Sequence, residues 1–292
     1  MNIKSIITII IIVSFNIISI HPILAQEVFD TKKQLSFMQI KSNNLQSNSN
    51  DRKFSNDISD FTGSVSRVLT SPFSWNKKDF YHAGGFLLLC SGSFFLDKEV
   101  RNIFLKNRNK TFDNLERVGY SYGSPLYSIS GGLLTYLTGL TFNNNWVRET
   151  GLMLTETLVI IGIIQVPTRI IFGRARPYNG FGSTSFKFLN GMGQDRASFI
   201  SGHAAIAIGM SNILAHQIDH PIATIGLYGL AAITPLSRLY DDKHWFSDVF
   251  IGSALGLFIS NAVIRFHEES SLTKSNFSLT PLPNGISLWY RF

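Results

Sequence analysis

Apolar stretches separated by short polar breaks make up most of the chain from Phe80 onward. Their lengths and their many small residues indicate helices that pack closely against one another. We expect six of them, at 80–96, 123–141, 148–168, 202–216, 221–237 and 245–265. None is an unbroken apolar run of the length that marks an unambiguous membrane span. The pattern therefore predicts an all-α helical bundle that is membrane-embedded or membrane-associated.

The ends of the chain depart from this pattern. Residues 1–25 contain Lys4, a nearly continuous apolar run and Ala25, an arrangement typical of a cleaved signal peptide. An uncleaved membrane anchor is the alternative, and either would direct the chain to export. Residues 26–78 are largely polar and rich in Asn and Ser, which predicts a flexible leader.

The helical domain is then expected to cover 79–267, followed by an extended C-terminal tail at 268–292. Apolar residues alternate along the end of this tail, at Ile286, Leu288, Tyr290 and Phe292. That alternation resembles the last strand of an outer-membrane barrel, but one strand cannot close a barrel. An extended tail packed on the bundle is the interpretation that we carry forward.

Composition agrees with a membrane-associated chain. Hydrophobic residues make up 45% and charged residues 15%, whereas an ordinary soluble domain has roughly 25% charged residues. The net charge of +7 does not come from a basic stripe with interleaved aromatic residues, so no nucleic-acid partner is expected. Cys90 is the single cysteine, which excludes a disulfide framework and a thiolate metal cluster. The oligomeric state leaves no signal in the sequence.

Polar residues gather in three short segments, each at the end of a predicted helix. These are RIIFGRARP at 169–177, SGH at 201–203 and SRLYDDKHWFSD at 237–248. The long break at 169–200, which begins with the first segment, is of a length that is usually functional or disordered. Taken singly, each feature has a structural explanation: a flanking arginine, a helix cap, a packing histidine or a surface ion pair. Their order along the chain favours a joint site at one end of the bundle.

These residue types suit phosphate chemistry. Guanidinium groups hold phosphate oxygens in pairs, and the start of a helix offers unpaired N–H groups to an anion. His244 and Asp248 are four residues apart and would share one helix face, where the carboxylate can orient the imidazole. An oriented histidine can attack phosphorus while a second histidine protonates the leaving oxygen. The set therefore indicates metal-free phosphoryl transfer through a phosphohistidine.

The three segments together resemble the signature of the type 2 phosphatidic acid phosphatase superfamily, which includes bacterial acid phosphatases and vanadium haloperoxidases. The family pattern is Lys-x6-Arg-Pro, then Pro-Ser-Gly-His, then Ser-Arg-x5-His-x3-Asp, and the resemblance covers roughly residues 80–265. It implies that His244 is the nucleophile, Asp248 its orienting carboxylate and His203 the general acid. It also implies a phosphate cradle formed by Arg169, Arg176, Ser201, the Gly202 amide and Arg238, with no metal ion and no other cofactor.

Two positions depart from the family pattern. Arg169 stands where the family has lysine, so a planar fork replaces a point charge. Ile200 replaces the proline that precedes the Ser-Gly-His triplet, which loosens the loop but removes no functional group. Arg174 has no role in the signature and is expected only to add to the positive electrostatic potential of the site.

By resemblance, the chain is a phosphoric ester hydrolase acting on a phosphomonoester or pyrophosphate of a membrane lipid. Phosphatidic acid, phosphatidylglycerophosphate and undecaprenyl pyrophosphate are the substrate types considered. The alternatives are a soluble periplasmic acid phosphatase, a vanadate-dependent haloperoxidase and a non-catalytic lipid-binding membrane protein. Vanadate would be a cofactor only of the haloperoxidase.

The expected location is the bacterial inner membrane with a site that faces the periplasm, or the periplasm itself. If the signal is cleaved and all six helices span, the motifs fall on the cytoplasmic side. The family's membrane members face outward, so one helix would fail to span, and 80–96 is our candidate. The basic segment 97–118, read as a loop, instead favours the cytoplasmic side, and the sequence leaves this conflict open.

Overall fold

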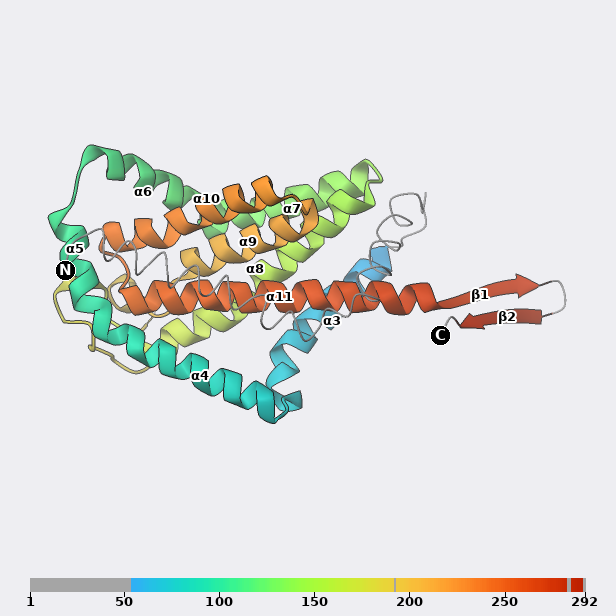
Figure 1. Cartoon of the computed structure of the whole chain (residues 1–292), viewed down its shortest axis with the longest axis horizontal. Helices are drawn as coiled ribbons and strands as arrows, with labels where there is room; N and C mark the ends of the chain where they lie inside the picture. Colours follow the sequence, from blue (N-terminus) through green and yellow to red (C-terminus); the bar gives the residue numbers. More distant parts are fainter. Residues whose placement is uncertain (1–53, 192, 283–284, 291–292) are drawn as a thin grey trace. The chain divides into compact units, whose positions relative to one another are not determined.

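The structure is a computed structural model that describes residues 54–191, 193–282 and 285–290. The signal peptide predicted at 1–25 lies outside these residues. Most of the described chain is helical (Figure 1). In chain order the elements are α3 (Phe54–Thr70), the 3-10 turn η1 (Ser71–Ser74), α4 (Lys77–Ser93), η2 (Phe94–Leu96), α5 (Asp97–Lys106), α6 (Lys110–Tyr122), α7 (Pro125–Thr141), α8 (Asn145–Phe172), η3 (Pro177–Asn179), η4 (Gln194–Arg196), α9 (Gly202–Ile218), α10 (Pro221–Tyr240), α11 (Phe246–Asn276), β1 (Phe277–Leu282) and β2 (Gly285–Tyr290).

The predicted all-α bundle is confirmed, and the six predicted helices correspond to α4, α7, α8, α9, α10 and α11. The segment 97–118, expected to be a loop, is instead helical and forms α5 and most of α6. A cap starts α6, because the Asn109 side chain accepts a hydrogen bond from the Phe112 N–H at 3.1 Å. Both helices are amphipathic rather than apolar, which is why the search for apolar stretches missed them.

Helix α9 lies at the centre of the bundle, in contact with α8, α10 and α11 (Figure 1). Its sequence contains four alanines and two glycines, and its buried positions lie on nearly every side. One hydrophobic cluster joins it to α8 and α11: Met153, Leu154, Leu158, Ile160, Ile161, Ala205, Ile206, Ile213, Ile259, Val263 and Ile264. The central helix is therefore held on several sides, which fixes the position of its first turn.

Two glycines of α11 allow this helix to lie close to the first turn of α9. A side chain at Gly252 would collide with the Ser201 carbonyl, and one at Gly256 with the Ala205 carbonyl. Because these glycines are four residues apart, they lie on one face of α11. Helix α11 can thus press directly against the Ser-Gly-His segment, as small residues allow at close helix contacts.

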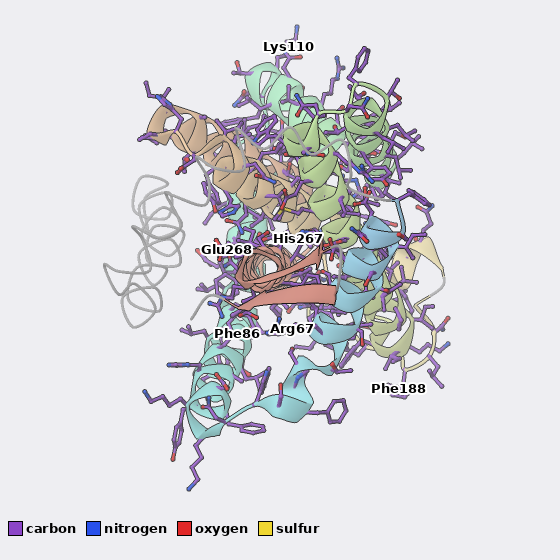
Figure 2. The ribbon with its side chains drawn as sticks, turned by 90° about the vertical axis from the view of Figure 1, so that its right-hand side faces the viewer. Arg67, Phe86, Lys110, Phe188, His267 and Glu268 are labelled. Atoms are coloured by element: carbon purple, nitrogen blue, oxygen red, sulfur yellow. The ribbon has the colours of Figure 1, made fainter. Side chains whose placement is uncertain are left out.

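Helix α3 lies inside the predicted leader, so the leader is not flexible over its whole length. The buried residues of this helix are all polar: Asp57, Asp60 and Ser64. Asp57 accepts hydrogen bonds from the Tyr136 hydroxyl at 2.8 Å and from Arg148 Nε at 2.7 Å. Beside this contact, His267 of α11 bonds to buried Glu156 at 2.9 Å, and Figure 2 labels His267 on the helix next to α3. A polar stripe, which hydrophobic periodicity cannot detect, thus docks α3 on the bundle.

Within the described residues, three helices are long and apolar enough to cross a membrane by length and composition: α8, α10 and the first 26 residues of α11. This fits the expected association with a membrane. Helix α4, the candidate for a non-spanning helix, is not among the three. At the other end of the domain, α11 extends to Asn276, so the predicted boundary at 267 falls inside it. An antiparallel hairpin of β1 and β2 follows, with Leu279 opposite Leu288.

Candidate active site

The three polar segments meet at the end of the bundle where α8 and α10 finish and α9 and α11 begin (Figure 1). The first segment contributes Arg169 and Arg176, which lie at the end of α8 and in the loop after it. The start of α9 contributes His203, the end of α10 contributes Arg238, and the turn before α11 contributes His244. Electrostatic interactions couple His203 to all four of the other side chains. The structure thus brings the predicted site residues together, while their catalytic roles stay predictions.

The tautomer of His244 follows from its hydrogen bond. The Nδ1 atom of this buried side chain lies 2.8 Å from the backbone carbonyl of Ser198. A carbonyl oxygen only accepts hydrogen bonds, so Nδ1 carries the proton and Nε2 keeps its lone pair. Burial lowers the pKa of His244 to about 4, and the charges of Arg176 and Arg169 act in the same direction, against Asp248. The imidazole is therefore neutral at neutral pH, as an attacking nitrogen must be.

Asp248 does not hydrogen-bond to His244. Its Oδ2 lies 3.8 Å from His244 Nδ1, an ion-pair distance that is too long for a hydrogen bond. The same oxygen accepts from the Ser198 hydroxyl at 2.5 Å and from the Trp245 N–H at 3.0 Å. The His-x3-Asp spacing predicts a direct hydrogen bond that orients His244. In the structure Ser198 instead hydrogen-bonds to both Asp248 and His244.

His203, the predicted general acid, has an unused nitrogen. Its ring stacks on Tyr120 with centroids 5.2 Å apart, and its buried Nε2 has no hydrogen-bond partner in the described chain. Burial lowers the pKa of His203 to about 3, and the positive charge of Arg238 adds to the effect. The imidazole is neutral without a ligand, and an anion beside it would favour its protonation.

The two arginines of the first segment are positioned differently. Arg169 has a buried Nε with no partner among the described residues. Arg176 is held by backbone carbonyls, since its Nε donates to Gln194 at 2.7 Å and its Nη1 to Lys243 at 3.2 Å. Burial lowers the pKa of Arg176 from its usual value. Neither guanidinium has a carboxylate within ion-pair distance among the described contacts, so both keep positive charge available for an anion.

Helix α6 supplies two site residues that sequence reasoning missed. Glu116 accepts a hydrogen bond from Arg238 Nη2 at 2.5 Å, and the Arg238 guanidinium lies 4.8 Å from the centre of the Tyr120 ring. Tyr120 is thus in contact with both the cradle arginine and His203. The four-residue spacing of Glu116 and Tyr120 on one helix face was the available signal. It was lost because the segment was read as a loop.

Arg174, which the motif comparison left without a role, is a central residue of the site. Its side chain is fully buried and donates to Asp248 Oδ1 at 2.5 Å and to Asp97 Oδ2 at 2.5 Å. It also donates to the Ser183 carbonyl at 2.9 Å and to the Ser247 hydroxyl at 2.7 Å. A buried guanidinium with two carboxylate partners ties α5, the first segment and the start of α11 together.

The Ser-Gly-His segment forms the first turn of α9 as expected. Ser201 is the N-cap residue, and its hydroxyl lies 3.5 Å from the Ala204 N–H. The Ser201 N–H donates to the Asp248 carbonyl at 3.1 Å. The Ile200 carbonyl accepts from Gln165 Nε2 at 3.1 Å, which anchors the residue that replaces the family's proline. The first-turn N–H groups of the helix, including that of Gly202, have no partner within the helix and can bind an anion.

The arrangement is chemically an anion site beside a neutral histidine. Several guanidinium groups and the start of α9 lie close to His203 and His244, and two buried nitrogens of this cluster have no partner among the described residues. No cluster of three or more His, Cys, Asp or Glu side chains that could hold a metal ion occurs in the described part of the chain. The groups present fit a phosphoryl group, which guanidinium and backbone N–H donors bind well.

Parts of the chain are similar to known proteins. Over 80 residues the chain is 32% identical to "Lipid A 1-phosphatase" of Porphyromonas gingivalis, an alignment that covers 27% of this chain and only 18% of that protein's length. The crystal structure of Aquifex aeolicus LpxE matches 58% of this chain and 95% of its own, at 18% identity and a TM-score of 0.44. The PAP2 superfamily model matches residues 150–271, which contain all three motifs. This part of the chain is therefore similar to the PAP2 superfamily, the type 2 phosphatidic acid phosphatase superfamily that its motifs resemble.

Proposed function

We propose that the protein is a metal-independent phosphatase that hydrolyses a lipid phosphate through a phosphohistidine on His244. One observation carries this proposal. The buried Nε of Arg169 and Nε2 of His203 have no hydrogen-bond partner among the described residues, and they belong to the same charged cluster as the neutral His244. Leaving buried polar groups unpaired costs about 1–3 kcal/mol each, so a site that keeps them unpaired is suited to a ligand that pairs them.

The chemistry follows from the hydrogen bonds. The Nε2 lone pair of His244 attacks phosphorus, and the bond from phosphorus to the lipid oxygen breaks. Protonated His203 gives its proton to that oxygen, which leaves as an alcohol or as a phosphate ester. A water molecule, deprotonated by His203, then attacks the phosphohistidine and releases inorganic phosphate from His244. The arginines Arg169, Arg176 and Arg238 would stabilise the charge on the phosphoryl oxygens in both steps.

A lipid is the favoured kind of substrate because of where the cluster lies. Arg169 and Arg238 are near the ends of two candidate membrane-spanning helices, and Asp248 is near the start of the third. A phosphate on a lipid headgroup would reach this end of the bundle while its chains lie beside the apolar helices. The similarity of an 80-residue stretch to a lipid A 1-phosphatase supports the same substrate class.

Phosphate release from defined lipids tests the function. Purified protein should hydrolyse at least one of phosphatidic acid, phosphatidylglycerophosphate, undecaprenyl pyrophosphate and lipid A 1-phosphate, and EDTA should leave the rate unchanged. Loss of activity in EDTA would contradict metal independence. Halide oxidation with vanadate but no phosphate release would instead favour a haloperoxidase, and lipid binding without either reaction would favour a non-catalytic protein.

We further propose that the site faces the periplasm, which the export signal expected at 1–25 supports. The same assay addresses this orientation when it is run on intact cells with a phosphomonoester that cannot cross the inner membrane. An outward-facing site gives the full rate before lysis. A rate that appears only after lysis would place the site on the cytoplasmic side.

Anion binding should take up protons. In the site without a ligand the pKa values of His203 and His244 are about 3 and about 4, so both side chains are neutral near neutral pH. A bound anion offsets the neighbouring cations and raises both pKa values. Affinity should therefore fall as the pH rises through the raised pKa values of the occupied site.

Calorimetric titration with sulfate near pH 6, in buffers of different ionisation enthalpy, measures this uptake. Sulfate suits the test because its own charge is constant in this range. We expect net proton uptake in the wild type, reduced uptake in His203→Asn and unchanged uptake in His220→Asn, whose side chain is exposed at the start of α10. Binding without proton uptake in the wild type would contradict the general-acid role of His203.

A further inference from the structure

Ser198 connects three parts of the site. This fully buried residue lies three positions before Ser201, outside the family motif. Its N–H donates to the Arg174 carbonyl at 3.2 Å, and its hydroxyl donates to Asp248 Oδ2 at 2.5 Å. Its carbonyl accepts from His244 Nδ1 at 2.8 Å. Every polar group of Ser198 is therefore engaged, and one of them holds the histidine.

Both oxygens of the Asp248 carboxylate accept hydrogen bonds from donors other than His244. Its Oδ1 accepts from Arg174, and its Oδ2 accepts from the Ser198 hydroxyl and the Trp245 N–H. The 3.8 Å that separate Oδ2 from His244 Nδ1 exceed the length of a hydrogen bond. Asp248 can affect the His244 imidazole through its charge. It can fix the orientation of the ring only through Ser198, which hydrogen-bonds to both side chains.

The wider network keeps Asp248 in this arrangement. Arg174 is shared between Asp248 and Asp97, and Asp97 also accepts from the Ser247 N–H at 2.8 Å. All three charged side chains are fully buried. With both carboxylates tied to one buried guanidinium, Asp248 has little freedom to turn toward His244.

We propose that Ser198 is a positioning residue for the nucleophile. Its carbonyl fixes the tautomer in which His244 Nε2 is free to attack, and Asp248 acts on His244 by holding Ser198 in place. The assignment rests on the proposed function for the identity of His244 as the nucleophile. A metal-binding histidine is oriented in a similar way, by a partner at its second nitrogen, and loss of that partner impairs the site.

A double-mutant cycle in phosphate release tests this link. We expect Ser198→Ala to lower kcat by roughly 10- to 100-fold, less than the ~10⁴-fold that follows loss of a triad carboxylate, because the backbone carbonyl remains. The KM should change by less than about twofold, because Ser198 does not contact the phosphate. Since Asp248 acts through Ser198, Asp248→Asn should lower kcat as well, and the double variant should be no slower than the slower single variant.

The matched control is Ser260→Ala. Ser260 is also fully buried and hydrogen-bonded, to Asn212 and to the Gly256 carbonyl, but it lies away from the site. It should keep the wild-type kcat, which separates loss of a buried hydroxyl from loss of positioning. If Ser198→Ala matches this control, or if the effects of Ser198→Ala and Asp248→Asn multiply, direct action of Asp248 is favoured and our proposal fails.

A spectroscopic measurement tests the same link without turnover. In protein labelled with ¹⁵N-histidine, the His244 signals are identified by their absence in His244→Ala. We expect the neutral Nδ1–H tautomer at neutral pH in the wild type, and we expect it to persist in Asp248→Asn because the Ser198 carbonyl still accepts. An Nε2–H tautomer in either protein overturns the inference. If no lipid is hydrolysed but the Nδ1–H tautomer is found, the proposed function fails while the positioning of His244 by Ser198 stands.

Discussion

His244→Ala should lower the hydrolysis of a lipid phosphate by about 10⁴- to 10⁶-fold, as removal of a nucleophile does in enzymes with a covalent intermediate. The reason is that Nδ1 of His244 donates to the Ser198 carbonyl, so Nε2 carries a lone pair that can attack phosphorus. His203 has no such bond among the described contacts, and its Nε2 is unpartnered. Phosphate release from the best lipid substrate measures the effect.

The matched control for this prediction is His220→Ala, which removes an exposed histidine that makes no side-chain cap hydrogen bond. It should keep the wild-type rate. Acid-labile, base-stable labelling of the wild type by a ³²P-labelled substrate should also disappear in His244→Ala. Residual activity within tenfold of the wild type in His244→Ala would show that another group attacks phosphorus.

Arg174→Ala should unfold the bundle at a markedly lower temperature. Arg174 is the buried cation shared by Asp97 and Asp248, and its removal leaves two buried carboxylates without a guanidinium partner. Breaking a buried ion pair from one side costs about 3–5 kcal/mol. For a chain of this size we expect the Tm to fall by roughly 10 °C or more. Thermal unfolding of the purified protein in detergent, followed by circular dichroism, measures the shift.

Arg117→Ala, which removes an exposed arginine of α6, is the matched control and should leave the Tm nearly unchanged. The effect of Arg174→Ala should also depend on pH. Burial raises the pKa of Asp97 and the charge of Arg174 opposes that rise. Without Arg174 the folded state binds a proton more tightly than the unfolded state, so the variant gains stability as the pH falls. The gap in Tm from the wild type should therefore narrow in acid, and a constant gap would contradict the charge argument.

Much of the helical framework could be predicted from sequence periodicity. Long apolar stretches marked α4 and α7 to α11, because burial of apolar side chains leaves a strong local pattern. Helices α5 and α6 were missed because polar residues cover much of their surface. Helix α3 was missed for a related reason: its buried residues Asp57, Asp60 and Ser64 are all polar, and Asp57 is paired with Arg148, which lies far away in the chain.

The candidate site divides in the same way. Spacing within the three motifs was enough to indicate which residues lie together at one end of the bundle. Each motif lies at a helix end, and residues four apart on a helix share one face. The motif spacing could not identify Glu116 or Tyr120, which come from a helix about 80 residues before the Ser-Gly-His segment. Their four-residue spacing indicates a shared helix face, but it does not reveal which distant residues that face contacts.

Residue types and spacing were enough to predict the class of fold, the resemblance to a phosphatase superfamily and the gathering of arginines and histidines at one end of the bundle. These properties depend on residue type and local spacing. The packed helices were needed to show that His244 hydrogen-bonds to Ser198 rather than to Asp248, and that Arg174 holds Asp97 and Asp248 together. The physical reason is that a buried hydrogen bond depends on which acceptor lies within about 3 Å. That distance is set by the packing of α5, α8, α9 and α11 as a whole.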